Sequence, residues 1–274
     1  MEGIKRMKKL TTYTPEHLLY LKKYKLKNVL VNVIRISLLA ILLLIWELGA
    51  RFEWINPFIT SSPSRIVKTI AGLYENGTLF YHVGTTLWET LAGFFIAVVL
   101  GYSIALALWW SEGARKVLEP YFVVLNALPK IALGPLIIIW CGTGSEAIVF
   151  MTVLIGLIVA ILNMLNGFMA TDENKLLLLK SMGASKLQIL TKLVIPSSLP
   201  SFISMLKINV GMAWIGSIMG EYIVSKAGIG YLIVYGGQVF KLDLVMSAVI
   251  ILCILAAIMY ALVALVEKLV IKNR

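Results

Sequence analysis

The side chains of this sequence with the clearest chemical potential are charged residues inside long apolar runs. Three of them are Lys130, Lys207 and Glu221. A charge within a bilayer is costly, so it usually meets another polar group, a water-filled cavity or a solute. Lys130 lies between Pro129 and Pro135, which interrupt backbone hydrogen bonding as in helices that border a cavity. We therefore predict that Lys130 faces a solute path.

The other two charges each have competing interpretations. Lys207 lies about 8 residues into its apolar run, so its ammonium group can reach lipid headgroups as readily as it can contact a solute. Glu221 lies near the far end of the same run, where it can serve a gate or pair with Lys226. Three polar residues of this run are path candidates that packing between helices explains as well: Asn209, Trp214 and Ser217.

Enzymatic chemistry has no support in the sequence. His17 and His82 are the only histidines, and no HExxH, nucleophile elbow or GxxxxGK[ST] phosphate loop occurs. Cys141 and Cys253 belong to no CxxC pair. We expect no catalytic residue, no metal site and no cofactor in this chain, so any ATP that drives it must be bound by another chain.

The elements that position these residues are apolar helices. The chain is 59% hydrophobic and 14% charged, with a mean hydropathy of +0.90, which is typical of a protein embedded in a bilayer. A spanning helix needs about 20 apolar residues. Six windows qualify, the last three with charges inside them: 90–111, 147–171, 244–266, 29–49, 120–140 and 199–224. We predict an all-α polytopic membrane protein with six transmembrane helices, in which a basic segment, 1–28, precedes a transmembrane domain, 29–274.

The distribution of basic residues predicts the orientation. With the N-terminus inside, 17 of the 25 Lys and Arg residues fall in inner segments, five in outer loops and three within spans. Both termini and residues 171–200 are therefore expected in the cytoplasm, with the chain in the inner or plasma membrane of the cell. The net charge of +11 then reflects topology and anionic membrane lipid, and no nucleic acid partner is implied.

Residues 171–200 form a polar, lysine-bearing insert between two apolar runs. Thr171 can cap a helix whose first turn carries Asp172 and Glu173 at the positive end of its dipole. Gly183 can take the left-handed conformation that ends this helix. The pattern predicts a first helix of about three turns.

A second helix is predicted directly after Gly183. Ser185 and Gln188 have the spacing of a capping box, and Pro196 marks the expected end of this helix. The hairpin is too apolar for a loop that faces only water, which predicts a docking surface. Its apolar residues are Leu176, Leu177, Leu178, Leu179, Met182, Leu187, Ile189 and Leu190.

The same insert resembles a known family. Gly183, nine further residues and Leu193-Val194-Ile195-Pro196 resemble the second half of the EAA loop of ABC importer permeases. Other segments between residues 60 and 270 resemble, in order, the nitrate, sulfonate and taurine branch of that family. They are Ser62-Pro63-Ser64, Gly77-Thr78-Leu79 with His82, Thr86-Leu87, Gly93-Phe94, Leu128-Pro129, Ala132-Leu133, Gly134-Pro135-Leu136, Trp140-Cys141-Gly142-Thr143-Gly144, Ala213-Trp214, Gly220-Glu221 and Gly228-Ile229-Gly230-Tyr231.

The chain departs from the family pattern at three places. Leu177-Leu178-Leu179 replaces the Glu-Ala-Ala triplet, Glu89 stands where a basic residue is usual, and Cys141 stands where Phe is usual. By resemblance, the loop carries the helix that couples to the ATPase. Its residues here are Lys180, Ser181, Met182, Gly183, Ala184 and Ser185, followed by Pro196. The lysines of this loop either pair with acids on the ATPase or follow the positive-inside bias, and both interpretations stay open.

The resemblance implies a type I ABC importer permease fold with both termini inside. It also implies a homodimer of permease, two cytoplasmic ATPase subunits that bind ATP and Mg, and an extracytoplasmic solute-binding protein. The expected solute is a small organic anion or oxyanion such as a sulfonate, taurine or nitrate, and the alternative is a neutral vitamin-like compound. Two other classes are an ATP-independent carrier or channel, and a membrane scaffold whose loop recruits a partner.

Overall fold

The computed structural model describes residues 15–271, and every regular element in that range is helical. Residues 1–14 and 272–274 lie outside the described part, and with them half of the predicted basic segment 1–28. The chain divides into two compact units, Met1–Arg65 and Ile66–Arg274. Each unit is described by itself.

The first unit consists mainly of one long helix, α2 (Pro15–Arg51). The most apolar window of its stretch Lys23–Arg51 has a mean hydropathy of 2.5, and none of that window is buried. The predicted span 29–49 lies within it. At the end of α2 the Glu47 carboxylate accepts hydrogen bonds from the Ser64 N–H at 3.0 Å and from the Ser64 hydroxyl at 2.8 Å. The short helix α3 (Pro57–Thr60) is capped by the Asn56 side chain.

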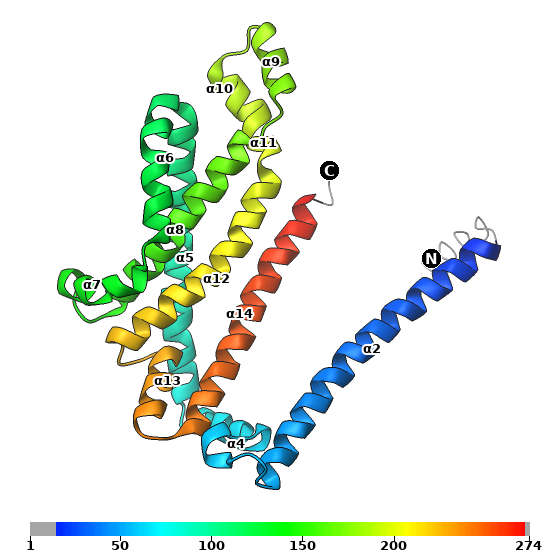
Figure 1. Ribbon diagram of the computed structural model, residues 1–274, viewed down its shortest axis with the longest axis vertical. Coiled ribbons are helices and arrows are strands. Elements are labelled where there is room, and N and C mark those ends of the chain that lie inside the picture. Colours follow the sequence, from blue (N-terminus) through cyan, green and yellow to red (C-terminus); the bar gives the residue numbers. More distant parts are fainter. Residues whose placement is uncertain (1–14, 272–274) are drawn as a thin grey trace. The chain divides into compact units, whose positions relative to one another are not determined.

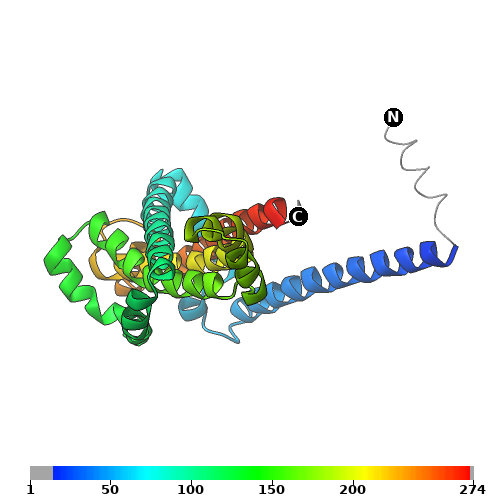
Figure 2. The same ribbon diagram turned by 90° about the horizontal axis from the view of Figure 1, so that it is seen from above.

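Three helices form the core of the second unit: α5 (Thr78–Trp110), α8 (Ser145–Met169) and α12 (Leu199–Val224). Figures 1 and 2 show α8 running beside both α5 and α12. Small residues allow this approach, as is usual for helices in membranes. A Cβ atom at Gly101 of α5 would lie 2.4 Å from the Ala160 Cβ of α8, and one at Gly216 of α12 would lie 2.5 Å from the Thr152 Cα of α8.

Two further helices, α13 (Ile229–Gln238) and α14 (Leu242–Ile271), pack on each other at the side of this core. Their contact buries a second apolar cluster, to which the C-terminal part of α4 (Pro63–Glu75) also contributes through Ile70 and Leu73. The buried members are Ile229, Leu232, Leu244, Ala248 and Ile251.

The predicted span 120–140 is not one straight helix. It divides into α6 (Glu112–Ala127) and, after a 3₁₀ turn at Lys130–Leu133, α7 (Gly134–Cys141), with a bend of 85° between the pieces. Leu128 is extended, with φ −67° and ψ 132°, because the ring of Pro129 disfavours the helical conformation in the residue before it. Pro129, which led to the prediction that this segment borders a solute path, therefore interrupts the helix.

The described residues contain five helices long and apolar enough to cross a membrane, or six if the bent pair forms one span. The predicted windows 147–171, 199–224 and 244–266 are confirmed by Ser145–Met169, Leu199–Val224 and Leu242–Leu269. The window 90–111 begins too late, since α5 starts at Thr78. Glu89 lies inside this helix, so no charge-free window can reach the start of α5.

The insert 171–200 contains α9 (Glu173–Ser181), α10 (Lys186–Ile189), a π-helical turn at Leu190–Val194 and α11 (Ile195–Ser197). Figure 1 shows α9 and α10 at one end of the second unit and α13 toward the opposite end. The two ends of the bundle therefore carry different candidate sites.

Candidate functional site

The first helix of the insert begins with a different cap from the one predicted. Asp172 is the N-cap residue, and its carboxylate accepts from the N–H groups of Asn174 at 2.9 Å and Lys175 at 3.4 Å. The prediction of Thr171 as the cap is wrong, because its hydroxyl donates to the Phe168 carbonyl at 2.9 Å and also contacts Ser197. Thr171 thus ties the end of α8 to the far side of the insert.

The turn between the helices is confirmed. Gly183 has φ 78°, the left-handed conformation that favours glycine. The Ala184 N–H donates to the Leu179 carbonyl and the Gly183 N–H to the Lys180 carbonyl, both at 3.0 Å. These two bonds form a Schellman motif, which satisfies carbonyl groups at the end of α9. The direction in which the chain leaves α9 is therefore fixed by hydrogen bonds.

The second helix begins as predicted and ends differently. Ser185 and Gln188 form a capping box, since each side chain accepts a hydrogen bond from the backbone N–H of the other. Pro196 does not end the helical path. The π-helical turn changes the hydrogen-bond register before it, so that Pro196 falls in the first turn of α11, where its missing N–H leaves no bond unmade.

The apolar residues of the insert divide into two groups. Leu176 and Leu179 pack against the core, and Ile189 and Leu190 are each 5% exposed. The other four form the apolar face of the loop and are 59–73% exposed: Leu177, Leu178, Met182 and Leu187. In the single chain this face is solvent-exposed, because the described residues do not pack against it. It is the surface that the sequence predicted for a partner.

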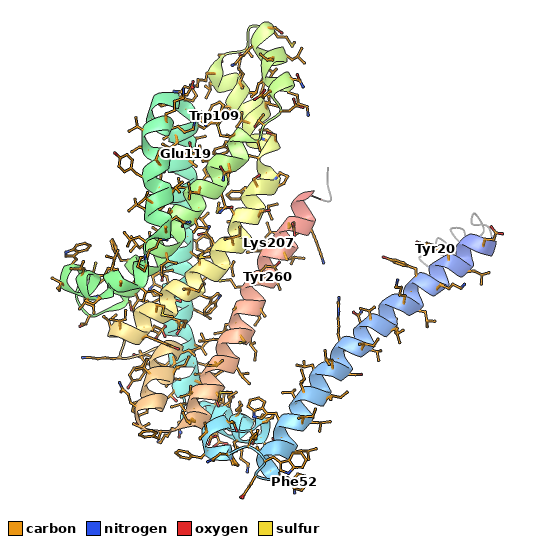
Figure 3. All side chains as sticks on the ribbon, in the orientation of Figure 1. Tyr20, Phe52, Trp109, Glu119, Lys207 and Tyr260 are labelled. Atoms are coloured by element: carbon orange, nitrogen blue, oxygen red, sulfur yellow. The ribbon has the colours of Figure 1, made fainter. Side chains whose placement is uncertain are left out.

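One lysine of the insert is bound within the chain. The Lys186 ammonium group donates to the Trp110 carbonyl at the end of α5 and lies 5.2 Å from the centroid of the Trp110 ring. A cavity of about 480 Å³ opens beside this contact, and Trp109 and Arg115 line it together with residues of α9 and α10; Figure 3 shows the position of Trp109. Lys186 therefore joins the insert to α5, while Lys180 stays exposed.

Four path candidates of α12 are buried in the single chain. Ser217 is fully buried and accepts a 2.7 Å hydrogen bond from Thr90 of α5. Asn209 is 1% exposed; its amide donates to the Met205 carbonyl at 3.2 Å, and its Oδ1 atom has no hydrogen-bond partner. Trp214 is 7% exposed with an unpartnered indole N–H. In this conformation these side chains pack between helices.

Glu221, the fourth of them, takes part in a network at the start of α13. Three successive N–H groups there donate to side chains of other helices. Gly228 donates to His82 Nδ1 at 3.1 Å, Ile229 to Thr86 Oγ1 at 2.7 Å and Gly230 to Glu221 Oε2 at 2.5 Å. His82 also stacks on Tyr231, with ring centroids 6.1 Å apart. Side chains of α5 and α12 thereby hold the N-terminus of α13. Glu221 contacts this helix and makes no ion pair with Lys226 among the described residues.

Sequence reasoning missed most of this network. His82 and Thr86 entered only as parts of a family pattern, and Glu89 only as a departure from it. A signal was present, because positions 82, 86 and 89 recur at the spacing of one helix face. The partners of His82 and Thr86, the N–H groups of Gly228 and Ile229, lie more than 140 residues away and have no local signature.

The two lysines predicted near the path differ in their surroundings. Lys130 lies at the break between α6 and α7, where its ammonium group is 3.3 Å from the Asn126 carbonyl and 3.5 Å from the Asn126 side-chain oxygen. Lys207 of α12 is 2.5 Å from the Glu267 carboxylate of α14 and 6.0 Å from the centroid of the Tyr260 ring. Figure 3 shows Lys207 and Tyr260 on these neighbouring helices.

A charge swap tests what Lys207 does. Lys207→Glu is expected to lower the thermal midpoint of unfolding, because two carboxylates then face each other between α12 and α14. Adding Glu267→Lys restores the pair and most of the midpoint, as well as uptake. The measurement is thermal unfolding and uptake for wild type, both single variants and the double variant. Restored stability without restored uptake would instead assign Lys207 to the solute path.

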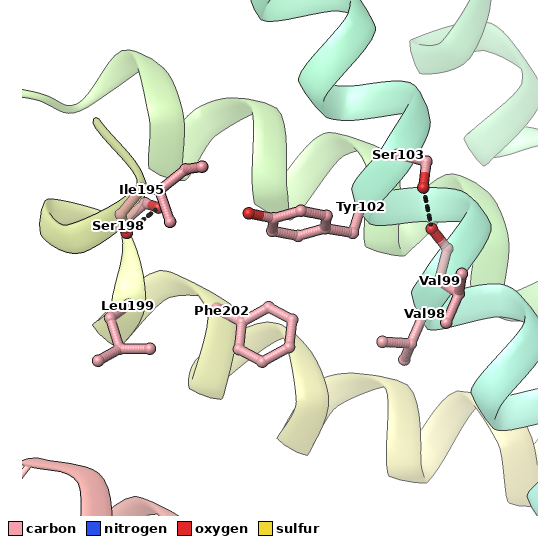
Figure 4. Close-up of a pocket in the computed structure, with 8 residues that line it drawn as sticks. All are labelled: Val98, Val99, Tyr102, Ser103, Ile195, Ser198, Leu199 and Phe202. Atoms are coloured by element: carbon pink, nitrogen blue, oxygen red, sulfur yellow. Dashed lines mark hydrogen bonds between the residues drawn. The ribbon is translucent and has the colours of Figure 1, made fainter. Parts of the chain in front are cut away.

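An apolar cavity of about 360 Å³ lies between α5 and the α11–α12 segment (Figure 4). Tyr102 points into it, and the hydroxyl groups of Ser103 and Ser198 are bound to carbonyls of their own helices, Val99 and Ile195. None of the predicted path residues lines this cavity. Its chemistry suits hydrocarbon and offers no charge to an ionic solute.

Comparison with known proteins identifies a sequence family and relatives that cover most of the chain. Residues 97–272 match the sequence family described as binding-protein-dependent transport system inner membrane component. The formylaminopyrimidine transport permease protein ThiX of Halalkalibacterium halodurans is 34% identical over 190 residues, which cover 69% of this chain and 75% of that protein. The taurine transport system permease protein TauC of Escherichia coli is 26% identical over 226 residues, 81% of this chain and 82% of that one.

Solved structures share the fold. A chain of the inward-facing MetNI methionine ABC transporter superposes with a TM-score of 0.59 at 18% identity, covering 69% of this chain and 96% of that chain. A chain of an amino acid ABC transporter crystallised with histidines gives a TM-score of 0.61 at 17% identity, covering 73% and 97%.

Proposed function

Because the chain belongs to the family of inner membrane components of binding-protein-dependent transport systems, we propose that it forms the solute path of an ATP-driven importer. Its relatives are transport permeases, and the chain itself is not an enzyme. In this proposal the energy for transport enters through residues 171–200, where an ATPase binds.

The observation that carries the proposal is the apolar face of the loop. Leu177, Leu178, Met182 and Leu187 are more than half exposed on a helical hairpin whose ends and turn are fixed by hydrogen bonds. A rigid apolar projection at one end of a bundle is suited to enter a groove of a partner protein. Two of the three leucines that replace the Glu-Ala-Ala triplet, Leu177 and Leu178, lie on this face and make the contact more apolar than the family pattern implies, while Leu179 packs against the core.

The distribution of basic residues supports a membrane orientation in which α9 and α10 lie in the cytoplasm and α13 lies near the outer surface, with both termini inside. The ATPase subunits, which bind ATP and Mg, then approach α9 and α10. The solute-binding protein approaches the opposite end. A homodimer completes the path, since five or six spans make a thin wall around a solute.

The proposed solute is a small organic molecule that the binding protein selects. Two observations favour an organic anion or oxyanion. The Lys130 ammonium group can attract a negative charge, and the relatives include taurine and sulfonate permeases. A neutral heterocyclic compound is the second candidate, because Glu267 neutralises the Lys207 charge and ThiX, named for formylaminopyrimidine, is 34% identical. Uptake of labelled taurine and of a labelled pyrimidine by the same vesicles distinguishes the two.

Purification of the tagged chain in a mild detergent tests the function. We expect a nucleotide-binding ATPase to remain bound at one copy per permease, and the complex to take up solute into liposomes only with ATP and the binding protein. A chain that is recovered alone and transports without nucleotide would be a carrier or channel. A bound partner without nucleotide-binding capacity would identify a scaffold.

A further inference from the structure

Two carboxyl groups from different helices meet inside the second unit. Glu89 of α5 and Glu221 of α12 are each 1% exposed. They lie on facing stretches of the two helices, which the Thr90–Ser217 hydrogen bond joins directly and the start of α13 joins through Thr86 and Glu221. One oxygen of each, Oε2 of Glu89 and Oε1 of Glu221, is buried without a hydrogen-bond partner. Two adjacent carboxylates in such surroundings repel each other strongly.

No cation compensates these charges. Among residues 15–271, no Lys or Arg side chain makes an ion pair with Glu89 or Glu221. His82 of α5 cannot supply a charge in this arrangement, because its Nδ1 atom accepts the Gly228 N–H and therefore carries no proton. A further titratable group beside the pair is the phenol of Tyr222 on α12, which is neutral at ordinary pH.

The surroundings differ between the two carboxyl groups. Glu221 Oε2 accepts the Gly230 N–H in the first turn of α13, where the helix dipole favours a negative charge. Glycine is needed on this side, since a Cβ at Gly228 or Gly230 would lie 2.4 Å or 2.7 Å from atoms of the Glu221 carboxylate. The polar groups that act on Glu89 belong to the side chains of Ser145 and Glu221. The ionised form therefore belongs on Glu221 and the proton on Glu89.

We propose that Glu89 and Glu221 form a buried proton-binding site, in which protonated Glu89 donates to the Glu221 carboxylate that holds the start of α13. Loss of this proton leaves two negative charges between α5 and α12 and weakens the attachment of α13. The site goes beyond the proposed transport function, because all its groups lie within one chain. It stands whether or not an ATPase partner exists.

The sign of the pH dependence follows from proton counts. In the folded chain Glu89 keeps a proton that the unfolded chain has released above its ordinary titration range. Stability then falls as pH rises. The equilibrium constant of folding decreases by at most about tenfold for each pH unit. Over about two pH units above the range in which carboxyl groups of the unfolded chain titrate, we expect the thermal midpoint of the purified full-length chain to fall by about 5 °C.

The matched variants are Glu89→Gln and Glu146→Gln. The glutamine amide at position 89 still donates to Glu221 but cannot ionise, so the midpoint should become nearly independent of pH. Glu146 is exposed at the start of α8, and its amide variant should keep the wild-type slope. His82 is present in all three proteins, so its own titration cancels in the comparison.

Infrared spectroscopy provides an independent measurement on the wild type, which needs no variant to fold. A buried protonated carboxyl C=O band at neutral pH, absent from Glu89→Gln if that variant folds, supports the site. A wild type without this band overturns the proposal, because both groups are then ionised. An equal pH slope in wild type and Glu89→Gln also overturns it.

Discussion

We expect uptake to fall at least about thirtyfold when Met182 is replaced by aspartate, while the chain still folds and inserts. Met182 is 73% exposed, so its loss removes little packing within the chain. A carboxylate at the centre of an apolar contact must lose its water without gaining a partner, which would weaken the proposed docking of an ATPase. The measurement is ATP-dependent uptake in vesicles, with the amount of inserted permease determined in parallel.

Asn174→Asp is the matched control, since it adds the same charge at the opposite, N-terminal end of α9, where a negative charge suits the helix dipole. It should retain most of the uptake. Normal uptake by Met182→Asp would remove this residue from the docking surface. Equal loss in both variants would mean that charge anywhere on the loop is harmful, and that the apolar face has no special role.

The second large effect is expected at Gly216, where α12 crosses α8. Gly216→Ala places a Cβ 2.5 Å from the backbone Cα of Thr152, so one helix must shift. Overpacking of this kind costs about 3 kcal/mol. For a chain of this length that corresponds to a fall of about 10 °C in the thermal midpoint. Thermal unfolding of the purified chain in detergent provides the measurement.

Gly211→Ala is the control on the same helix. A Cβ at Gly211 meets nothing within 4 Å, and alanine favours the helix. Its midpoint should equal or exceed that of the wild type. If both variants unfold at the wild-type temperature, the close approach of α8 and α12 does not determine the stability of this bundle.

Local patterns predicted the local features well. The span 199–224 and the capping box of Ser185 and Gln188 follow from hydropathy and from spacing within a few residues. The left-handed turn at Gly183 follows from the requirement for glycine at the end of a helix. Each of these depends on interactions that neighbours in the sequence make.

Features that depend on distant partners could not be predicted in the same way. Lys207 has the same local sequence whether it contacts a solute, lipid or Glu267, and only the packing of α14 decides between them. The predicted window 90–111 excludes Glu89, because a buried carboxyl group has no apolar signature in the sequence. Pro129 indicates an interruption of the helix from the sequence alone, but the angle of 85° at that point depends on how α7 packs on α8.

Photo-cross-linking from the loop tests most directly whether residues 171–200 receive the ATPase. In a chain with Cys141 and Cys253 replaced by alanine, benzophenone maleimide is attached to Met182→Cys, and to Asn76→Cys in the turn before α5 as control. The account predicts that illumination of native membranes links a nucleotide-binding ATPase to position 182 and not to position 76. The reagent can also be attached to Leu178→Cys and Leu187→Cys. If none of the three positions on the loop captures an ATPase subunit in membranes with active uptake, the account is contradicted.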